Sequence, residues 1–196
     1  MQARGSIAVL LCALAMSVCL GCGQSDGGPS PISGENPAAP TEQLGGASDD
    51  SGTANAQDVS LKIAGREEYD ALIGAHAGKV VVVDFWATWC GPCVEQFPHT
   101  VQLSRKFDPA DVAVVSVSMD EPADEESVRA FLQNAGAEFE NLISKYGVGQ
   151  EGFEAFEITD GAIPHYKVYD QAGELRRAAS SNEGLEELIE QLLDEE

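Results

Sequence analysis

Basic residues are scarce in this chain of 196 residues. Only 11 Lys and Arg are present against 33 Asp and Glu, which gives a formal net charge of −22. A surface this acidic repels the phosphates of nucleic acids, so we expect no nucleic-acid partner. The charge is otherwise typical of an acidic, soluble surface and carries no information about catalysis.

Long hydrophobic runs are lacking as well. The most apolar stretch, residues 7–20, has about fourteen residues, which suits the core of a signal peptide and is short for a helix that spans a bilayer. Arg4 places a positive charge before this stretch, and Cys19-Leu20-Gly21-Cys22 ends it. The segment resembles a bacterial lipoprotein signal, in which a cysteine after a small residue receives the lipid.

Three segments are therefore expected along the chain. We expect residues 1–21 to be a lipoprotein signal peptide and Cys22 to carry the lipid, which makes the protein an extracytoplasmic, membrane-anchored lipoprotein on the periplasmic side. The alternative is an ordinary secretory signal, in which Cys22 is incidental. Residues 22–57 contain almost no large apolar side chain and are expected to form a disordered tether. Residues 58–196 then form one domain.

Cysteine is also rare, with five residues in the whole chain. Cys12 and Cys19 would leave with the signal peptide and Cys22 would take the lipid, so Cys90 and Cys93 remain as a pair. A zinc site is not expected, because no second Cys or His pair completes four ligands. Two thiols at Cys-X-X-Cys spacing in an αβ context can instead give or take two electrons as a disulfide.

The hydrophobic pattern of the domain changes repeatedly between strand and helix periods. The segments 80–85 and 112–117 are continuously apolar, as strands buried on both faces are. Alternation or short apolar runs predict further strands at 59–63, 139–143, 165–169 and 175–178. Helical spacing predicts helices at 66–76, 94–107, 125–134 and 183–193, with a helical turn at 152–156. This order predicts an α/β fold with a mixed central sheet covered by helices on both faces.

The segment Asp84-Phe-Trp-Ala-Thr-Trp-Cys-Gly-Pro-Cys93 resembles the active-site segment of thioredoxin-fold proteins. Pro98 stands where thioredoxins kink the helix after the dithiol, and Ile163-Pro164 stands where they have a cis-proline. Residues 124–143 resemble the helix-strand insertion of the extracytoplasmic TlpA-like and ResA-like thiol-disulfide oxidoreductases. The resemblance implies a thioredoxin fold with this inserted segment over residues 58–193.

The same resemblance implies the catalytic residues. Cys90, at the N-terminus of a helix, is expected to attack the substrate disulfide as a thiolate, stabilised by unpaired backbone N–H groups and the helix dipole. Cys93, one turn deeper, is expected to resolve the mixed disulfide. Asp84 matches the buried carboxylate behind the dithiol, and we expect burial to raise its pKa so that it accepts a proton from Cys93.

The resemblance also implies which residues bind the substrate. Trp89 is expected to give a flat apolar surface beside the sulfurs, and Gly91-Pro92 to tighten the turn between the cysteines. Cis-Pro164 is expected to leave the backbone groups of Ile163 free to pair with an extended substrate segment. His165 follows it where the family often has Thr, and we expect its imidazole to favour the thiolate and make the pair more oxidising.

The function implied is exchange of the Cys90-Cys93 dithiol with protein disulfides, without a cofactor or a metal. We expect a reductant, because Gly-Pro between the cysteines resembles thioredoxin. We expect a membrane electron-donor protein to supply its electrons. Cytochrome c biogenesis is one task that fits. The alternatives are a thioredoxin-fold peroxidase and a non-catalytic binding or copper-handling module, in which His99 or His165 would serve as a distant third ligand.

Overall fold

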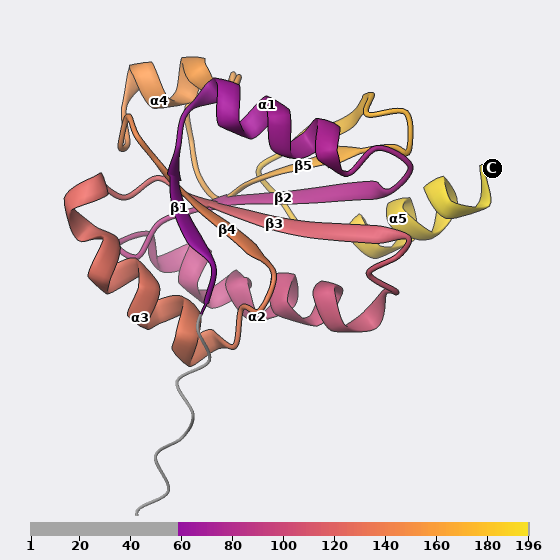
Figure 1. Ribbon diagram of the computed structural model, residues 1–196, viewed down its shortest axis with the longest axis horizontal. Helices are drawn as coiled ribbons and strands as arrows, with labels where there is room; N and C mark the ends of the chain where they lie inside the picture. The colour runs from indigo at the N-terminus through magenta and orange to yellow at the C-terminus, as the bar shows by residue number, and fades with distance from the viewer. Residues whose placement is uncertain (1–58, 196) are drawn as a thin grey trace, which may run out of the picture. The chain divides into compact units, whose positions relative to one another are not determined.

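The computed structural model describes residues 59–195. The expected signal peptide, the expected lipid attachment at Cys22 and the whole expected tether lie outside these residues. In the described part a mixed sheet is covered by helices on both faces (Figure 1). The strands are β1 (Leu61–Ala64), β2 (Val80–Trp86), β3 (Val112–Ser118), β4 (Glu140–Ser144), β5 (His165–Tyr169) and β6 (Leu175–Ala179). The helices are α1 (Arg66–Ala75), α2 (Gly91–Lys106), η1 (Pro122–Asp124), α3 (Glu125–Ala135), α4 (Gln150–Ala155) and α5 (Leu185–Asp194).

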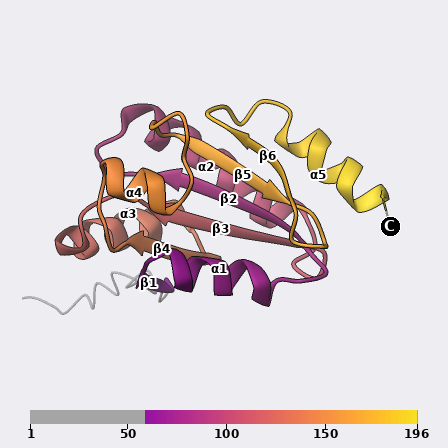
Figure 2. The ribbon, with the colours of Figure 1, turned by 90° about the horizontal axis from the view of Figure 1, so that it is seen from above.

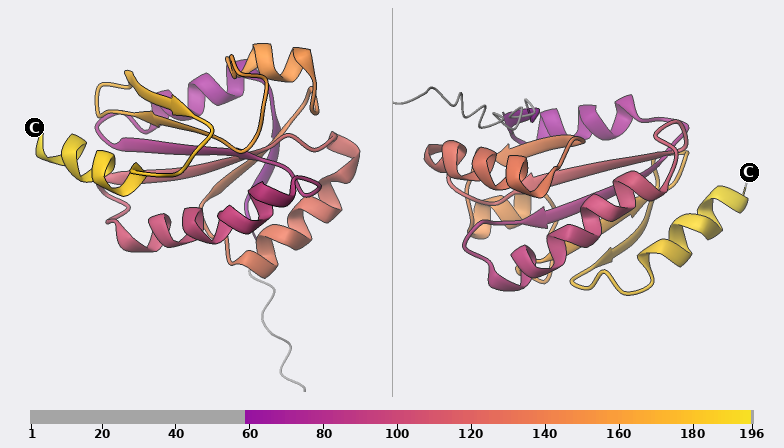
Figure 3. Two further views of the ribbon diagram at one scale, coloured as in Figure 1. Left: turned by 180° about the vertical axis from the view of Figure 1, so that it is seen from behind. Right: turned by 90° about the horizontal axis from the view of Figure 1, so that it is seen from below.

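The sheet has six strands in the order β1-β4-β3-β2-β5-β6. The first four in this order run parallel to one another, and β5 and β6 are antiparallel to their neighbours. The predicted α/β class with a mixed central sheet is confirmed. Figures 2 and 3 show the same layers from above, behind and below. No helix within residues 59–195 is long and apolar enough to span a bilayer.

Strand β2 lies in the middle of the sheet and all seven of its residues are buried. Side chains alternate between the two faces of a strand. Val80 and Val82 pack with the α2 and α5 side chains Leu103 and Ile189. Phe85 points to the other face, where its ring centroid is 5.9 Å from that of Tyr69 in α1. The strand is therefore fixed from both sides up to the point where it delivers the dithiol.

The inserted segment forms the helix and strand that the resemblance implied. Helix α3 packs Phe131 against Trp86 at the end of β2, with ring centroids 4.6 Å apart. Strand β4 lies between β3 and β1, and Ser116 Oγ donates a hydrogen bond to Asn141 Oδ1 at 2.8 Å. The insertion therefore extends the sheet and closes the core beneath the end of β2, where the active-site segment begins.

One boundary differs from the prediction in a way that matters for the site. The helix expected from residue 94 begins at Gly91, because Cys90 acts as its N-cap and Pro92 stands in its first turn. Proline suits this position, since its missing N–H has no partner there in any helix. The start of α2 therefore includes both cysteines.

Candidate active site

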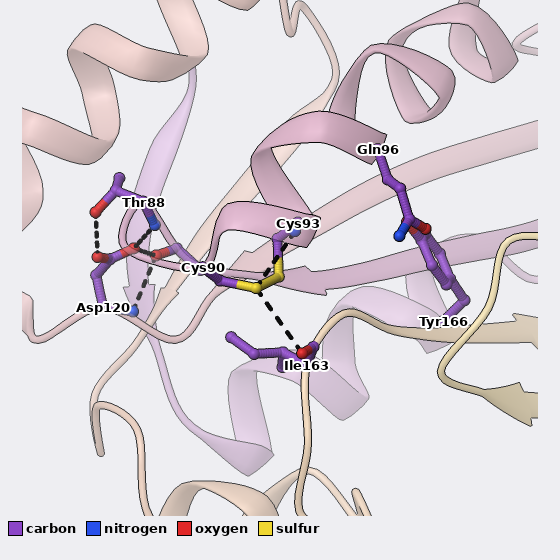
Figure 4. The surroundings of a disulfide bond; sticks show 8 residues. Thr88, Cys90, Cys93, Gln96, Asp120, Ile163 and Tyr166 are labelled. Atoms are coloured by element: carbon purple, nitrogen blue, oxygen red, sulfur yellow. Dashed lines mark hydrogen bonds between the residues drawn. A yellow bond between two sulfur atoms is a disulfide. The ribbon is translucent and has the colours of Figure 1, made fainter.

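The dithiol lies where β2 gives way to α2 (Figure 4). Cys90 and Cys93 are joined in a disulfide and are 7% and 2% exposed, so the second cysteine is the deeper one. The backbone N–H of Cys93 donates to the Sγ of Cys90 at 3.3 Å. An N–H of the first helical turn aimed at this sulfur stabilises negative charge on it, together with the helix dipole. The geometry therefore favours Cys90 as the thiolate.

The loop before β5 approaches the dithiol from the other side. The Ile163-Pro164 peptide bond is cis, as expected. The carbonyl oxygen of Ile163 lies 3.8 Å from the Sγ of Cys90. Ile163 is half-buried and Pro164 is buried, so the backbone of this loop borders the sulfur that a substrate must reach.

The remaining predicted contact residues lie on the rim of this site. Trp89 is the most exposed large apolar side chain described, at 56% exposure, and directly precedes Cys90. Gly91 and Pro92 are exposed at the start of α2, and Pro98 lies inside that helix. Ile163 thus lies against the Cys90 sulfur. Trp89, Gly91 and Pro92 are exposed beside Cys90 in the chain.

Asp84 is buried beneath α2, on the side of β2 that faces this helix. Its Oδ2 accepts a hydrogen bond of 2.5 Å from the hydroxyl of Thr100, and its Oδ1 has no partner within the described residues. Burial raises the pKa of Asp84 to about 7, although the hydrogen bond from Thr100 acts in the opposite direction. A carboxyl group with this pKa can both accept and return a proton near neutral pH.

A second buried carboxylate, Asp120, holds the segment that leads into Cys90, and sequence reasoning missed it. Asp120 follows β3, and its Oδ2 accepts the backbone N–H of Thr88 at 2.9 Å (Figure 4). Its two oxygens also accept the hydroxyls of Thr88 and Ser118, both at 2.5 Å. The only available signal was that parallel strands end at a common edge, which places the residues after β2 and β3 side by side.

Replacing Asp120 by Ala is expected to lower the free energy of unfolding by about 3 kcal/mol, because the buried hydroxyl of Ser118 and two half-buried donors of Thr88 lose their acceptor. The measurement is urea unfolding of the oxidised protein. The matched control is Asp124→Ala, since Asp124 is exposed and its side chain caps no backbone group. A loss no larger than that of the control, about 0.5 kcal/mol, would show that Asp120 does not hold this segment.

His165 lies on the face of the sheet away from α2 and packs on Phe85. It pairs with Phe85 across β2 and β5, on the opposite face of the sheet from Asp84 and α2. Its ring packs on Phe85 with centroids 6.2 Å apart, and its Nδ1 lies 3.2 Å from the carboxylate of Asp160, outside hydrogen-bond geometry. Burial lowers the pKa of His165 in spite of Asp160, which disfavours the charged imidazole. The effect expected of this titratable imidazole on the Cys90 thiolate stays a prediction.

The histidines considered for copper have other neighbours. His99 lies 3.5 Å from Glu186 of α5, and His165 faces Asp160. Within residues 59–195 no group of three or more His, Cys, Asp or Glu side chains is placed to hold a metal ion. The described chemistry of the site is therefore that of two thiols, a buried carboxyl group and backbone amides.

Comparison with known proteins places this site in a family. The sequence profile of the AhpC/TSA family matches residues 54–178. The chain belongs to this family. It is 34% identical over 97 residues to the thioredoxin-like protein YneN of Bacillus subtilis, across 49% of this chain and 55% of that protein. It is 28% identical over 104 residues to the thiol-disulfide oxidoreductase ResA of Bacillus anthracis, across 50% of this chain and 59% of that protein.

Solved structures show the same fold. A putative thiol:disulfide interchange protein DsbE from Chlorobium tepidum is similar with a TM-score of 0.53 and 27% identity, over 62% of this chain and 84% of that one. The thioredoxin-like fold implied by the sequence is therefore confirmed. The matched region spans between half and three fifths of the length of the curated relatives.

Proposed function

We propose that this AhpC/TSA family member is a thiol-disulfide oxidoreductase that exchanges its Cys90-Cys93 pair with disulfides of other proteins. One observation carries the proposal. The Sγ of Cys90 lies at the N-terminus of α2, accepts the N–H of Cys93, and faces the backbone of Ile163 before the cis-proline. This arrangement combines a stabilised thiolate with a strip of backbone against which an extended substrate can lie. The names of the ResA and DsbE relatives support it.

The reaction follows from the positions of the two sulfurs. In the reduced protein the Cys90 thiolate attacks one sulfur of the client disulfide, and the other client sulfur leaves as a thiolate. Cys93 then loses its proton and attacks the Sγ of Cys90. The mixed disulfide breaks, the second client thiolate is released, and the Cys90-Cys93 disulfide closes. Two electrons pass from the protein to the client.

Asp84 is the proton acceptor that we assign to the second step. It is the buried carboxyl group on the α2 side of β2, and its pKa of about 7 lets it take the Cys93 proton without holding it permanently. Thr100 orients the carboxyl group through its hydroxyl. A water molecule is the expected carrier between the Cys93 thiol and Asp84.

The peroxidase alternative has less support from the site. A peroxidase of this fold would need one attacking cysteine in a pocket supported by Thr and Arg. Here Cys90 is bonded to Cys93, and the hydroxyl of the nearby Thr88 donates to Asp120.

The test of the proposed function is the reduction of insulin disulfides with dithiothreitol as electron source. Insulin precipitation no faster than with dithiothreitol alone would contradict the proposal.

We further propose that the protein works as a reductant outside the cytoplasm and that a membrane donor protein restores its dithiol. The apolar stretch before Cys22 and the Gly-Pro pair between the cysteines support this assignment. Cytochrome c biogenesis is one task that such a reductant fits, because it needs reduced cysteines on a secreted client.

Cells that express the protein with labelled palmitate are expected to incorporate label into the wild type and not into Cys22→Ala. The reason is that Cys22 supplies the thiol to which the lipid is attached. Cys12→Ala is the matched control, since that cysteine lies inside the apolar stretch and should leave the label unchanged. Equal labelling of the wild type and Cys22→Ala would contradict the anchor.

A further inference from the structure

A groove of about 580 Å³ lies between α4 and the segment 157–161, which leads to the cis-proline. Phe153 and Ile158 form its apolar wall, and Gly161 also lines it. Glu154 and Glu157 stand on its rim. The exchange chemistry described above uses none of these residues. A groove of this size holds one or two large apolar side chains.

The walls of the groove are fixed before any ligand arrives. Within the segment the N–H of Ile158 donates to the carbonyl of Phe153 at 2.8 Å, and that of Gly161 to Ile158 at 3.1 Å. The buried ammonium of Lys167 in β5 donates to the carbonyl of Phe156 at 2.7 Å. A preformed groove binds without the entropic cost of ordering its walls.

Arg66 of α1 holds the same segment from the other side. Its guanidinium donates to the carbonyl of Ala155 at 3.2 Å and lies 3.1 Å from the carboxylate of Glu157. Arg66 of α1 and Lys167 of β5 therefore both donate to carbonyls at the C-terminal end of α4. Unpaired carbonyls and the helix dipole favour positive charge there. The groove is a rigid part of the fold.

The groove is continuous with the dithiol site along the chain. Gly161 is two residues before Ile163, so their Cα atoms are at most about 7 Å apart. The carbonyl of Ile163 is itself 3.8 Å from the Sγ of Cys90. A client segment that lies extended along this loop, with its cysteine at Cys90, reaches the groove with a side chain two to four residues away.

The charge of the groove rim determines which client residue can stand next to the apolar side chain in the groove. Glu154 is exposed and pairs only with the neutral amide of Gln150 among the described contacts, and the chain as a whole carries a formal charge of −22. Glu157 lies 3.1 Å from Arg66 and 3.9 Å from Lys167. Most of the free negative charge of the rim therefore comes from Glu154. A basic residue beside an apolar one complements this rim, and an acidic residue is repelled.

We propose that this groove is a specificity subsite for the client. It takes a large apolar side chain, flanked by Lys or Arg, two to four residues from the target cysteine in an extended segment. The subsite rests on the proposed disulfide exchange and adds the class of sequence that the exchange prefers.

The test uses synthetic peptides whose single cysteine is a mixed disulfide with 5-thio-2-nitrobenzoate. Leu or Ser is placed two, three or four residues from the cysteine on either side, next to Lys or Glu. Attack of reduced Cys90 on the peptide sulfur releases the coloured thiolate, so its absorbance gives the second-order rate constant. The best Leu-Lys peptide is expected to react at least about tenfold faster than its Ser-Glu partner.

Variants locate this preference in the groove. Phe153→Ser is expected to remove the preference for Leu, and Glu154→Lys the preference for Lys over Glu at low salt. Glu187→Lys in α5 makes the same change of charge at an exposed site and should leave both preferences intact. Thr159→Arg, at an exposed residue lining the groove, fills it without removing a core side chain and should act like Phe153→Ser.

The small disulfide 5,5′-dithiobis(2-nitrobenzoate) separates failure of the subsite from failure of the proposed function. All of these variants should reduce it as fast as the wild type does, because it is too small to use the groove. Equal rates for Leu and Ser at every position would overturn the subsite, as would a Leu preference that survives in both Phe153→Ser and Thr159→Arg. If the wild type reduces neither compound, the exchange chemistry itself is wrong.

Discussion

Cys90→Ser is expected to reduce insulin at the background rate of dithiothreitol alone. The reason is that Cys90 Sγ is the sulfur at the start of α2 that receives the Cys93 N–H and faces the substrate loop. Cys93 is 2% exposed and lies behind it, so it cannot replace Cys90 as the attacking group. A serine hydroxyl at this position is not ionised at neutral pH and forms no disulfide.

This substitution is a clean test because serine preserves the local structure. Cys90 is the N-cap of α2, and serine is among the preferred N-cap residues. Circular dichroism and thermal unfolding, compared with the reduced wild type, are expected to show a folded variant. Retention of more than about a tenth of the wild-type rate in insulin reduction would mean that another group attacks the client.

Asp84→Asn is expected to stabilise the oxidised protein by up to about 4 kcal/mol above pH 7, since a pKa raised from 3.8 to about 7 corresponds to roughly three units at 1.36 kcal/mol each. The folded state holds the Asp84 proton more tightly than the unfolded chain does. The contribution of this protonation to the free energy of unfolding is therefore complete below about pH 4 and is lost as the pH rises towards 7. Asparagine keeps the shape and carries no such cost.

The measurement is urea unfolding of wild type and Asp84→Asn at pH 5 and pH 8. The advantage of the variant should grow by about 3 kcal/mol between these values, because about two of the three units of the shift lie between pH 5 and pH 7. Asp124→Asn, at an exposed carboxylate, is the matched control and should show no such growth. An advantage of Asp84→Asn that is the same at both pH values would contradict a buried carboxyl group with a raised pKa.

The fold could be predicted from the sequence because its apolar runs, glycines and turn residues all indicate the same element boundaries. The continuous valines before Asp84, the glycine at 136 and the turn at 171–173 each mark an element boundary that the structure retains. The cis-proline and the raised pKa of Asp84 were also found, because the motif around the dithiol implies them. The hydrophobic pattern and the family motif are both properties of short segments of sequence. The cis-proline and Asp84 lie within or beside such segments, so both could be predicted.

The features that were missed depend on contacts between distant segments. Thr100 meets Asp84 across a helix-strand interface, and Asp120 meets Thr88 across the ends of two strands. The packing of His165 on Phe85 was also missed, because the residue after the cis-proline points to the opposite face of the sheet from Asp84. One residue of register decides this, and neither composition nor spacing fixes it.

The most direct test of the central claim is covalent trapping of clients. Cys93→Ser, purified with its clients under non-reducing conditions, is expected to carry proteins bound through Cys90 and to release them when dithiothreitol is added. The double variant Cys90→Ser/Cys93→Ser is expected to capture none. Capture by Cys90→Ser through Cys93, with none by Cys93→Ser, would contradict the account, because it would make the deeper cysteine the attacking group.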